Sequence, residues 1–220
     1  MRAPDASDKP SKAPRDGVAR CLLRLAAMRI ALRLCLIAAA GCTSSAGGAV
    51  TGQPPGGTFQ TADTISAAVT VSDGAGGTTS SAQIVLASTP HLCSDAGASP
   101  PIDRKLQRFI TLDLRDVTGS SRTAPAAPGT YTIYPDTGSE PPKSASLATG
   151  SLDATCQPAD ADAASAQSGT VTLTSVTGGA FAGSFDVVLN TGGHLSGSFD
   201  PEPCPQLAAA VTSTDPHSCQ

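Results

Sequence analysis

The residue types that carry acid–base or nucleophilic chemistry form no recognisable catalytic pattern in this chain. Its three histidines are His91, His194 and His217. His91 follows Pro90 in an expected loop, His194 adjoins a Gly-Gly turn, and His217 is close to the C-terminus. Ser and Asp are so frequent that a Ser-His-Asp set could be assembled from almost any of them. The G-x-S-x-G, H-E-x-x-H and phosphate-binding glycine-loop motifs are absent. The sequence therefore predicts no catalytic residue and no cofactor or metal site.

Two pairs of carboxylates were considered as general acid and base of a glycosidase, whose mechanism uses two such groups. Asp113 and Asp116 flank Arg115, where we expect solvated ion pairing near a strand edge. Asp160 and Asp162 lie in an Ala-rich loop and lack the ordered oxygen ligands of an EF-hand. Neither pair predicts an enzyme.

Four cysteines follow Cys42, namely Cys93, Cys156, Cys204 and Cys219. An even number in an exported chain favours two disulfides, for which three pairings are possible. We favour Cys93–Cys156 and Cys204–Cys219. Structural zinc sites use closely spaced cysteine pairs, whereas the closest spacing here is Cys204 to Cys219, so zinc is disfavoured.

The charge of the chain is divided at Cys42. Residues 1–41 contain eight Lys or Arg and three Asp, a net charge of +5, and the remainder has six against fifteen, a net charge of −9. An acidic body repels phosphate backbones, which argues against nucleic-acid binding. Its one basic cluster, 104–108, could contact an acidic partner or lipid headgroups, but we expect a solvated segment.

The end of the basic leader has the features of an export signal. Arg29 and Arg33 precede a short apolar run that ends in small residues. The run is too short to span a bilayer, for which about 20 residues are needed, and has the length of a signal-peptide core. The alternatives are an ordinary secretory signal and a buried cytoplasmic helix.

Ala39-Ala40-Gly41-Cys42 resembles the lipobox of bacterial lipoproteins, although Leu is commoner where Ala39 stands. The resemblance implies that Cys42 receives a lipid and becomes the N-terminus after cleavage. Thr43 takes the place of the Asp that commonly retains lipoproteins in the inner membrane, which favours the outer membrane. Residues 1–41 are thus expected to be a signal peptide, with translation starting at Met28 rather than Met1.

Residues 42–57 are expected to be a lipidated cysteine and a flexible tether. From residue 58 the apolar residues alternate with small polar ones, which is typical of strands. The predicted strands are 65–71, 82–86, 109–114, 130–133, 146–154, 170–176, 181–189 and 195–199. About eight short strands with Gly and Pro turns predict an all-β fold, for which we favour an antiparallel β-sandwich over 58–204. The only helix candidate, 102–108, is a single turn at best, and 205–220 are expected to be a tail tied by a disulfide.

The C-terminal part repeats a tetrapeptide, Gly183-Ser184-Phe185-Asp186 and Gly197-Ser198-Phe199-Asp200, on either side of a Gly-rich turn. The repeat predicts a β-hairpin with each Phe on one face, extended to a three-stranded meander by 170–174. This region, ending in Cys204, resembles uncharacterised lipoproteins of large-genome Gram-negative bacteria, especially myxobacteria. The resemblance covers about the last third of the chain and implies architecture and location but no activity.

These observations predict a lipid-anchored module outside the cytoplasm, attached to the membrane through its lipid, with a binding or structural role in the cell envelope. An envelope protein or glycan would be its partner. The alternatives are a small hydrolase of envelope material and a subunit of an outer-membrane assembly that pairs through an exposed strand edge. A deep pocket joining a histidine, a carboxylate and a hydroxyl would favour the hydrolase, and scattered histidines on shallow loops would favour the binding module.

Overall fold

A computed structural model of the protein describes residues 47–72 and 77–220. The expected signal peptide, the alternative start at Met28 and the lipidation of Cys42 lie outside the described residues and stay predictions.

The described chain is all-β, as the alternation of its residues predicts. Its strands are β1 (Gly47–Gly52), β2 (Asp63–Ser72), β3 (Thr78–Ala87), β4 (Ile102–Asp103), β5 (Arg108–Thr118), β6 (Ser121–Thr123), β7 (Gly129–Ile133), β8 (Lys143–Ser151), β9 (Ala164–Thr177), β10 (Ala180–Leu189), β11 (His194–Asp200), β12 (Glu202–Pro203) and β13 (Ser218–Cys219). The helices are α2 (Leu92–Ala96) and α3 (Pro205–Thr212), with a 3₁₀ turn at Asp160–Asp162. Each of the eight predicted strands is present, and the additional ones are mostly very short.

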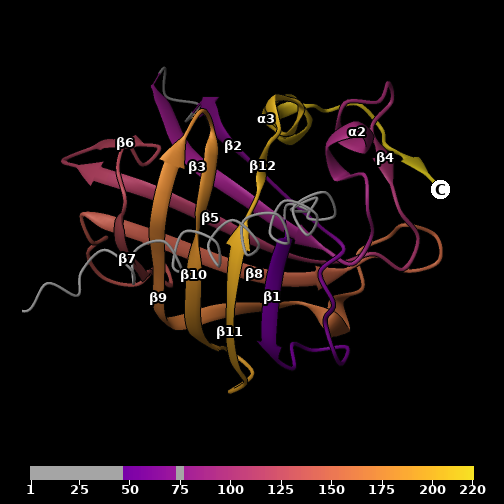
Figure 1. Cartoon of the computed structure of the whole chain (residues 1–220), viewed down its shortest axis with the longest axis horizontal. Helices are drawn as coiled ribbons and strands as arrows, with labels where there is room; N and C mark the ends of the chain where they lie inside the picture. Colours follow the sequence, from indigo (N-terminus) through magenta and orange to yellow (C-terminus); the bar gives the residue numbers. More distant parts are fainter. Residues whose placement is uncertain (1–46, 73–76) are drawn as a thin grey trace, which may run out of the picture. The chain divides into compact units, whose positions relative to one another are not determined.

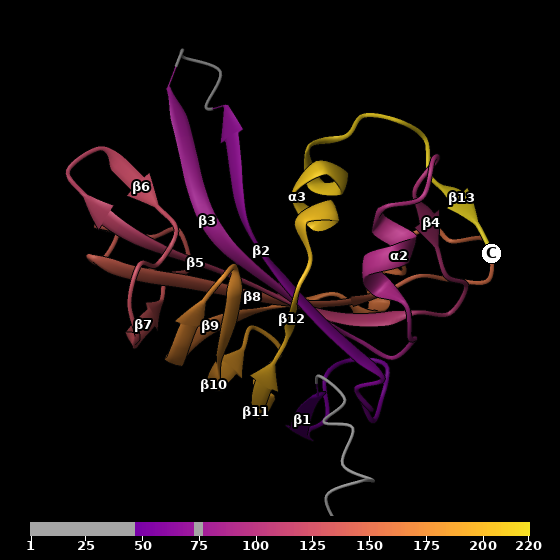
Figure 2. The same cartoon turned by 45° about the horizontal axis from the view of Figure 1, so that its top comes forward.

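Hydrogen bonding joins most of the strands into one sheet of eleven, with the order β1-β11-β10-β9-β7-β8-β5-β3-β2-β12 and β6 beside β5. The sheet curls strongly, so that β9, β10, β11 and β1 cross in front of β5 and β8 (Figure 1). The all-β prediction is confirmed, and most of the strands belong to one curled sheet; the finer expectation of a sandwich stays a prediction. The hairpin of β2 and β3 projects from the body (Figure 2).

The main core fills the concave side of this sheet. It combines aliphatic side chains of β3, β5 and β8 with side chains of β7, β9, β10 and β11. Tyr131 and Phe199 are its largest fully buried side chains. The alternation of inward apolar and outward polar residues along each strand is the same pattern from which the strands were predicted.

The predicted meander is confirmed by the antiparallel pairing of β10 with both β9 and β11. Register places each Phe of the repeated tetrapeptide opposite a Gly of the other copy, Phe185 across from Gly197 and Phe199 across from Gly183. Both Phe rings are buried and stack with centroids 6.5 Å apart.

The expected tether contains a strand. All six residues of β1 pair antiparallel with β11, and the half-buried Val50 packs against the main core. The flexible tether predicted through residue 57 is thus wrong for Gly47–Gly52. A strand of small residues with one apolar side chain gives almost no periodic signal, which is why it was missed.

A second, smaller core lies on the outer face of β2. Ile65, Ala67 and Val69 of β2 meet Leu207 of α3 and the buried Cys204. Helix α3 begins with Pro205, a residue favoured at the first helical position, and one short helix offers too little sequence for a 3.6-residue pattern. In residues 47–72 and 77–220, no helix has the length and apolar character needed to cross a membrane.

Candidate functional site

Two disulfides gather α2, β4, α3 and β13 into a region that we call the disulfide-linked lobe. Cys93 of α2 is bonded to Cys204, and Cys156 of the β8–β9 loop is bonded to Cys219 of β13. Two disulfides are confirmed, but the favoured pairing, Cys93–Cys156 and Cys204–Cys219, is wrong.

The physical reason is the path of the chain after β11. After β11, which lies near one end of the sheet, the chain crosses to the opposite end, where β12 pairs parallel with β2. This crossover carries Cys204 to α2. Strand β13 then pairs with β4, which brings Cys219 to Cys156. Sequence spacing contains no information about this crossover. The tail is tied by a disulfide, as expected, although to a different partner.

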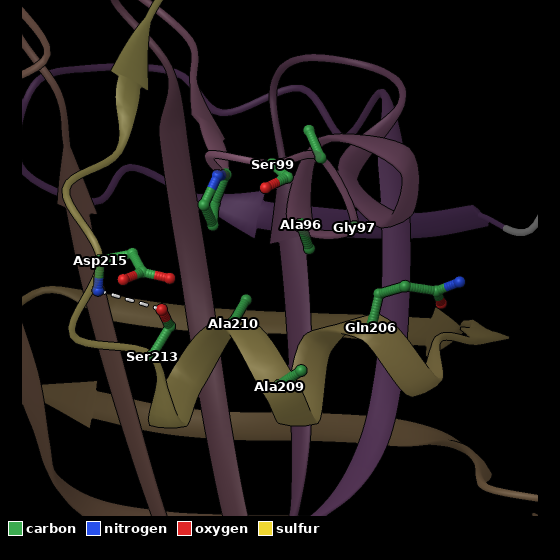
Figure 3. Close-up of a pocket in the computed structure, with 10 residues that line it drawn as sticks. Ala96, Gly97, Ser99, Gln206, Ala209, Ala210, Ser213 and Asp215 are labelled. Carbon is green, nitrogen blue, oxygen red and sulfur yellow. Dashed lines mark hydrogen bonds between the residues drawn. The ribbon is translucent and has the colours of Figure 1, made fainter.

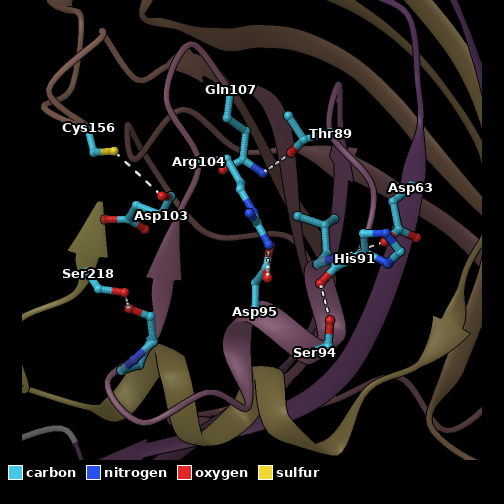
Figure 4. Close-up of polar contacts among 12 residues, drawn as sticks. Asp63, Thr89, His91, Ser94, Asp95, Asp103, Arg104, Gln107, Cys156 and Ser218 are labelled. Atoms are coloured by element: carbon cyan, nitrogen blue, oxygen red, sulfur yellow. Dashed lines mark hydrogen bonds and ion pairs between the residues drawn. The ribbon is translucent and has the colours of Figure 1, made fainter. Parts of the chain in front are cut away.

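An ion pair fixes α2 to the loop after β4. The Arg104 guanidinium donates two hydrogen bonds to the Asp95 carboxylate, at 2.6 and 2.8 Å (Figure 4). Asp95 is only 5% exposed. The hydrogen bond from Arg104 to Asp95 raises the pKa of the guanidinium. This pair could not be predicted from the sequence, because tertiary packing brings its two members together.

The basic cluster 104–108 is not a free positive surface. Arg104 is committed to Asp95, and Arg108 donates to the main-chain carbonyls of Pro55, Gly57 and Thr58. The Arg108 guanidinium also lies 6.0 Å from the centre of the Phe59 ring. The expectation of a solvated segment is wrong for both arginines, because each makes a specific structural contact.

The described histidines lie at three separate places. His91 precedes α2 with an exposed side chain, and its carbonyl accepts a hydrogen bond from Ser94 (Figure 4). His194 Nε2 is 2.8 Å from Asp186 Oδ1 on the exposed face of the β10–β11 hairpin. His217 Nδ1 is 3.0 Å from Asp103 Oδ1. The ring nitrogens of His194 and His217 thus contact carboxylates.

The carboxylates considered for glycosidase chemistry serve separate ion pairs and hydrogen bonds. Asp113 binds Arg115 at 2.5 Å, and Asp116 binds Lys143 at 3.2 Å and accepts a hydrogen bond from Tyr131.

The two members of the second carboxylate pair, Asp160 and Asp162, also have different surroundings. Asp162 accepts a 2.6 Å hydrogen bond from Ser151, whereas Asp160 is exposed. In the part of the chain that the structure describes, no group of three or more His, Cys, Asp or Glu side chains could hold a metal ion.

The lobe contains two hollows. One, of about 270 Å³, lies between α3 and the loop after α2 and is lined mainly by small residues; its polar side chains are Ser99, Gln206, Ser213 and Asp215 (Figure 3). The other, of about 140 Å³, lies beneath α2 and α3 and is mostly apolar, with Asp95, Asp103 and His217 among its lining residues. These hollows combine no nucleophile with a base and an orienting group, and suit binding better than catalysis.

No protein-family model, curated protein or solved structure matches the chain with significant similarity.

Proposed function

We propose that the protein is a lipid-anchored β-domain outside the cytoplasm, with a binding or structural role in the cell envelope. The observation that carries the proposal is the pairing of Cys93, Cys156, Cys204 and Cys219 in two disulfides. Disulfides persist in oxidising compartments and are rare in the cytosol. The basic leader, the short apolar run and the lipobox-like Ala39-Ala40-Gly41-Cys42 support the same location.

A binding or structural role is favoured over hydrolysis by the arrangement of the histidines. His194 and His217 each contact one carboxylate, on different parts of the described structure, and His91 precedes α2. A hydrolytic site would need a nucleophile, a base and an orienting group within hydrogen-bond reach of one another.

Substitution of Cys42 tests the anchor directly. Cells expressing the wild-type chain are labelled with radioactive palmitate, and the chain is followed in membrane and soluble fractions. We expect a labelled, membrane-bound protein, and an unlabelled one for Cys42→Ala. Cys35→Ala is the matched control, because Cys35 precedes the expected cleavage site and should leave labelling unchanged. Labelling that survives Cys42→Ala, or a wild-type chain without label, would reject the proposal.

A further inference from the structure

A groove on the side of the sheet away from the disulfide-linked lobe has the composition of a ligand site. Strands β8 and β9 pair directly only at Ala148↔Ser165 and Thr149↔Ala164. Farther along, β7 lies between them, paired with β8 at Thr132↔Ser144 and Ile133↔Ala145 and with β9 from Gly129↔Leu173 to Thr132↔Thr170. The two strands therefore separate at a fork, and the chain leaving β7 borders it.

The fork holds a cavity of about 290 Å³, which we call the fork groove. Tyr134 and Asp136 border it from the β7–β8 loop, Ser146 from β8, Gln167 from β9, and Asn190 from the turn after β10. A smaller hollow of about 60 Å³ shares Tyr134, Asp136 and Ser146 and continues the groove toward Arg115. The volume is close to the lower end of the ~300–1,000 Å³ range of ligand sites.

Local hydrogen bonds hold the lining residues in place. The Tyr134 hydroxyl donates to the Gly138 carbonyl at 3.0 Å, and its main-chain N–H donates to Ala145 at 2.8 Å. The Asn190 N–H donates to the Ser165 carbonyl at 2.8 Å, and its Oδ1 accepts from the Ser165 N–H at 3.3 Å. The amide nitrogen of Asn190 keeps its two donors for another partner. These bonds order Tyr134 and Asn190 before binding, which lowers the conformational entropy lost by these two residues.

The charges at the groove select against anions. Arg115 is paired with Asp113 at 2.5 Å, and Glu140 is paired with Arg122 at 2.7 Å. Asp136 is exposed and has no ion-pair partner among the described residues. The groove thus presents one uncompensated negative charge beside neutral amide and hydroxyl groups, which would repel phosphate or carboxylate ligands.

We propose that the fork groove binds a neutral saccharide. The hydroxyl groups of a sugar are both donors and acceptors, and they match the acceptor carboxylate of Asp136 and the mixed amide groups of Gln167 and Asn190. Tyr134, the aromatic side chain that lines the groove, offers an apolar ring face for the C–H side of a sugar ring. This inference names a ligand class for the binding role proposed above, and it rests on that proposed role.

The test measures binding of the purified full-length chain to neutral oligosaccharides, including gluco- and N-acetylglucosamine oligomers. Oligogalacturonates and deacetylated amino-sugar oligomers are the acidic and basic comparators. Saturation-transfer NMR detects binding, and calorimetry gives Kd. We expect at least one neutral oligosaccharide to bind and the acidic ones to bind at least tenfold more weakly. No binding by any neutral sugar, or a preference for acidic or amino sugars, would overturn the proposal.

Variants locate the site. Tyr134→Ala, Asp136→Asn and Gln167→Ala should each weaken binding about tenfold or more, whereas Tyr134→Phe, which keeps the ring, should retain most of it. Gln206→Ala and Asp215→Asn, in the larger hollow of the disulfide-linked lobe, are the matched controls and should leave Kd unchanged. Melting temperatures show that each variant is folded. Loss of binding only in the two control variants would place the saccharide in the lobe and reject the fork groove.

This test and the Cys42 experiment fail independently. A chain that is lipidated but binds no saccharide rejects only the fork groove as a saccharide site. A chain that binds saccharide but carries no lipid rejects only the anchor.

Discussion

Phe185 and Gly197 show how single residues determine the packing of the meander. A Cβ atom added at Gly197 would lie 2.6 Å from the tip of the Phe185 ring and 2.5 Å from the Ala49 carbonyl oxygen of β1. Gly197 thus lets a buried ring and a neighbouring strand approach the same point. The sequence predicted the hairpin from its repeated tetrapeptide, but the need for glycine at this position follows from the pairing with β1, which the sequence did not reveal.

We therefore expect Gly197→Ala to lower the free energy of unfolding by about 1–3 kcal/mol, as overpacking of a core usually does. Chemical denaturation monitored by circular dichroism measures the change. Gly193→Ala is the matched control, because a Cβ atom there would lie 3.7 Å or more from its neighbours. The control should stay within about 0.5 kcal/mol of wild type. Equal effects of the two substitutions would contradict the packing argument.

A second example at the scale of residues is the hydrogen-bonded cluster of Tyr131, Lys143 and Asp116. The Tyr131 hydroxyl donates to Asp116 at 3.0 Å, and Lys143 Nζ lies 3.2 Å from both the Tyr131 hydroxyl and Asp116. Burial raises the pKa of Tyr131, and the hydrogen bond with Tyr131 raises the pKa of Lys143. Both groups hold their protons more tightly in the folded state, so their stabilising effect is complete below their unfolded pKa values and is lost as pH rises through the folded ones.

Stability should accordingly fall as pH rises above about 10, where unfolded tyrosine and lysine begin to lose their protons, and keep falling until the raised folded pKa values are passed. Urea unfolding at a series of pH values measures the fall. Tyr131→Phe removes the titrating hydroxyl and its bond to Lys143, so this variant should lose less stability over the same range. An identical pH dependence in Tyr131→Phe and wild type would show that the cluster does not contribute.

At the scale of elements, whether a strand or helix could be predicted from the sequence depends on its length and on the periodicity of its apolar residues. Strands such as β5 and β10, which are 11 and 10 residues long and contain alternating apolar residues, were predicted correctly. Strand β1 and helix α3 were missed, because small residues and a single short helix carry little periodic signal. The two disulfides were predicted but not their connectivity, which depends on the crossover of the chain from β11 to β2.

Peptide mapping under non-reducing, acidic conditions should find Cys93 linked to Cys204 and Cys156 linked to Cys219. A peptide joining Cys93 to Cys156, or Cys204 to Cys219, would contradict the described topology.

Replacing both members of the Cys93–Cys204 pair by Ala should lower the free energy of unfolding by about 2–4 kcal/mol, mainly because the unfolded chain gains conformational entropy without the bridge.

Arg108 connects two elements, because it joins β5 to the segment between β1 and β2. We expect Arg108→Ala to cost about 1–3 kcal/mol and to speed amide exchange of Gly57, whose N–H donates to Pro54 in that segment. Exchange is measured by NMR or mass spectrometry. Lys105→Ala is the control, since the Lys105 side chain is exposed, and it should change neither quantity appreciably. Unchanged exchange in Arg108→Ala would show that other contacts fix the segment.

At the scale of the whole molecule, the chain combines a basic leader with an acidic, disulfide-bonded β-domain. The location outside the cytoplasm stays a proposal from the sequence, where export signals are read from local composition. The fork groove could not be predicted from the sequence, because Tyr134, Gln167 and Asn190 approach one another only through the separation of β8 and β9. The histidines and carboxylates first considered for catalysis proved, in the described residues, to belong to separate contacts.

The most direct test of the central proposal is the intact mass of the protein extracted from membranes, with and without reduction before alkylation. We expect a chain that begins at Cys42, carries a lipid, and has four further cysteines that are alkylated only after reduction. A chain without lipid that retains Met1 or Met28 and reacts with the alkylating agent before reduction would contradict it.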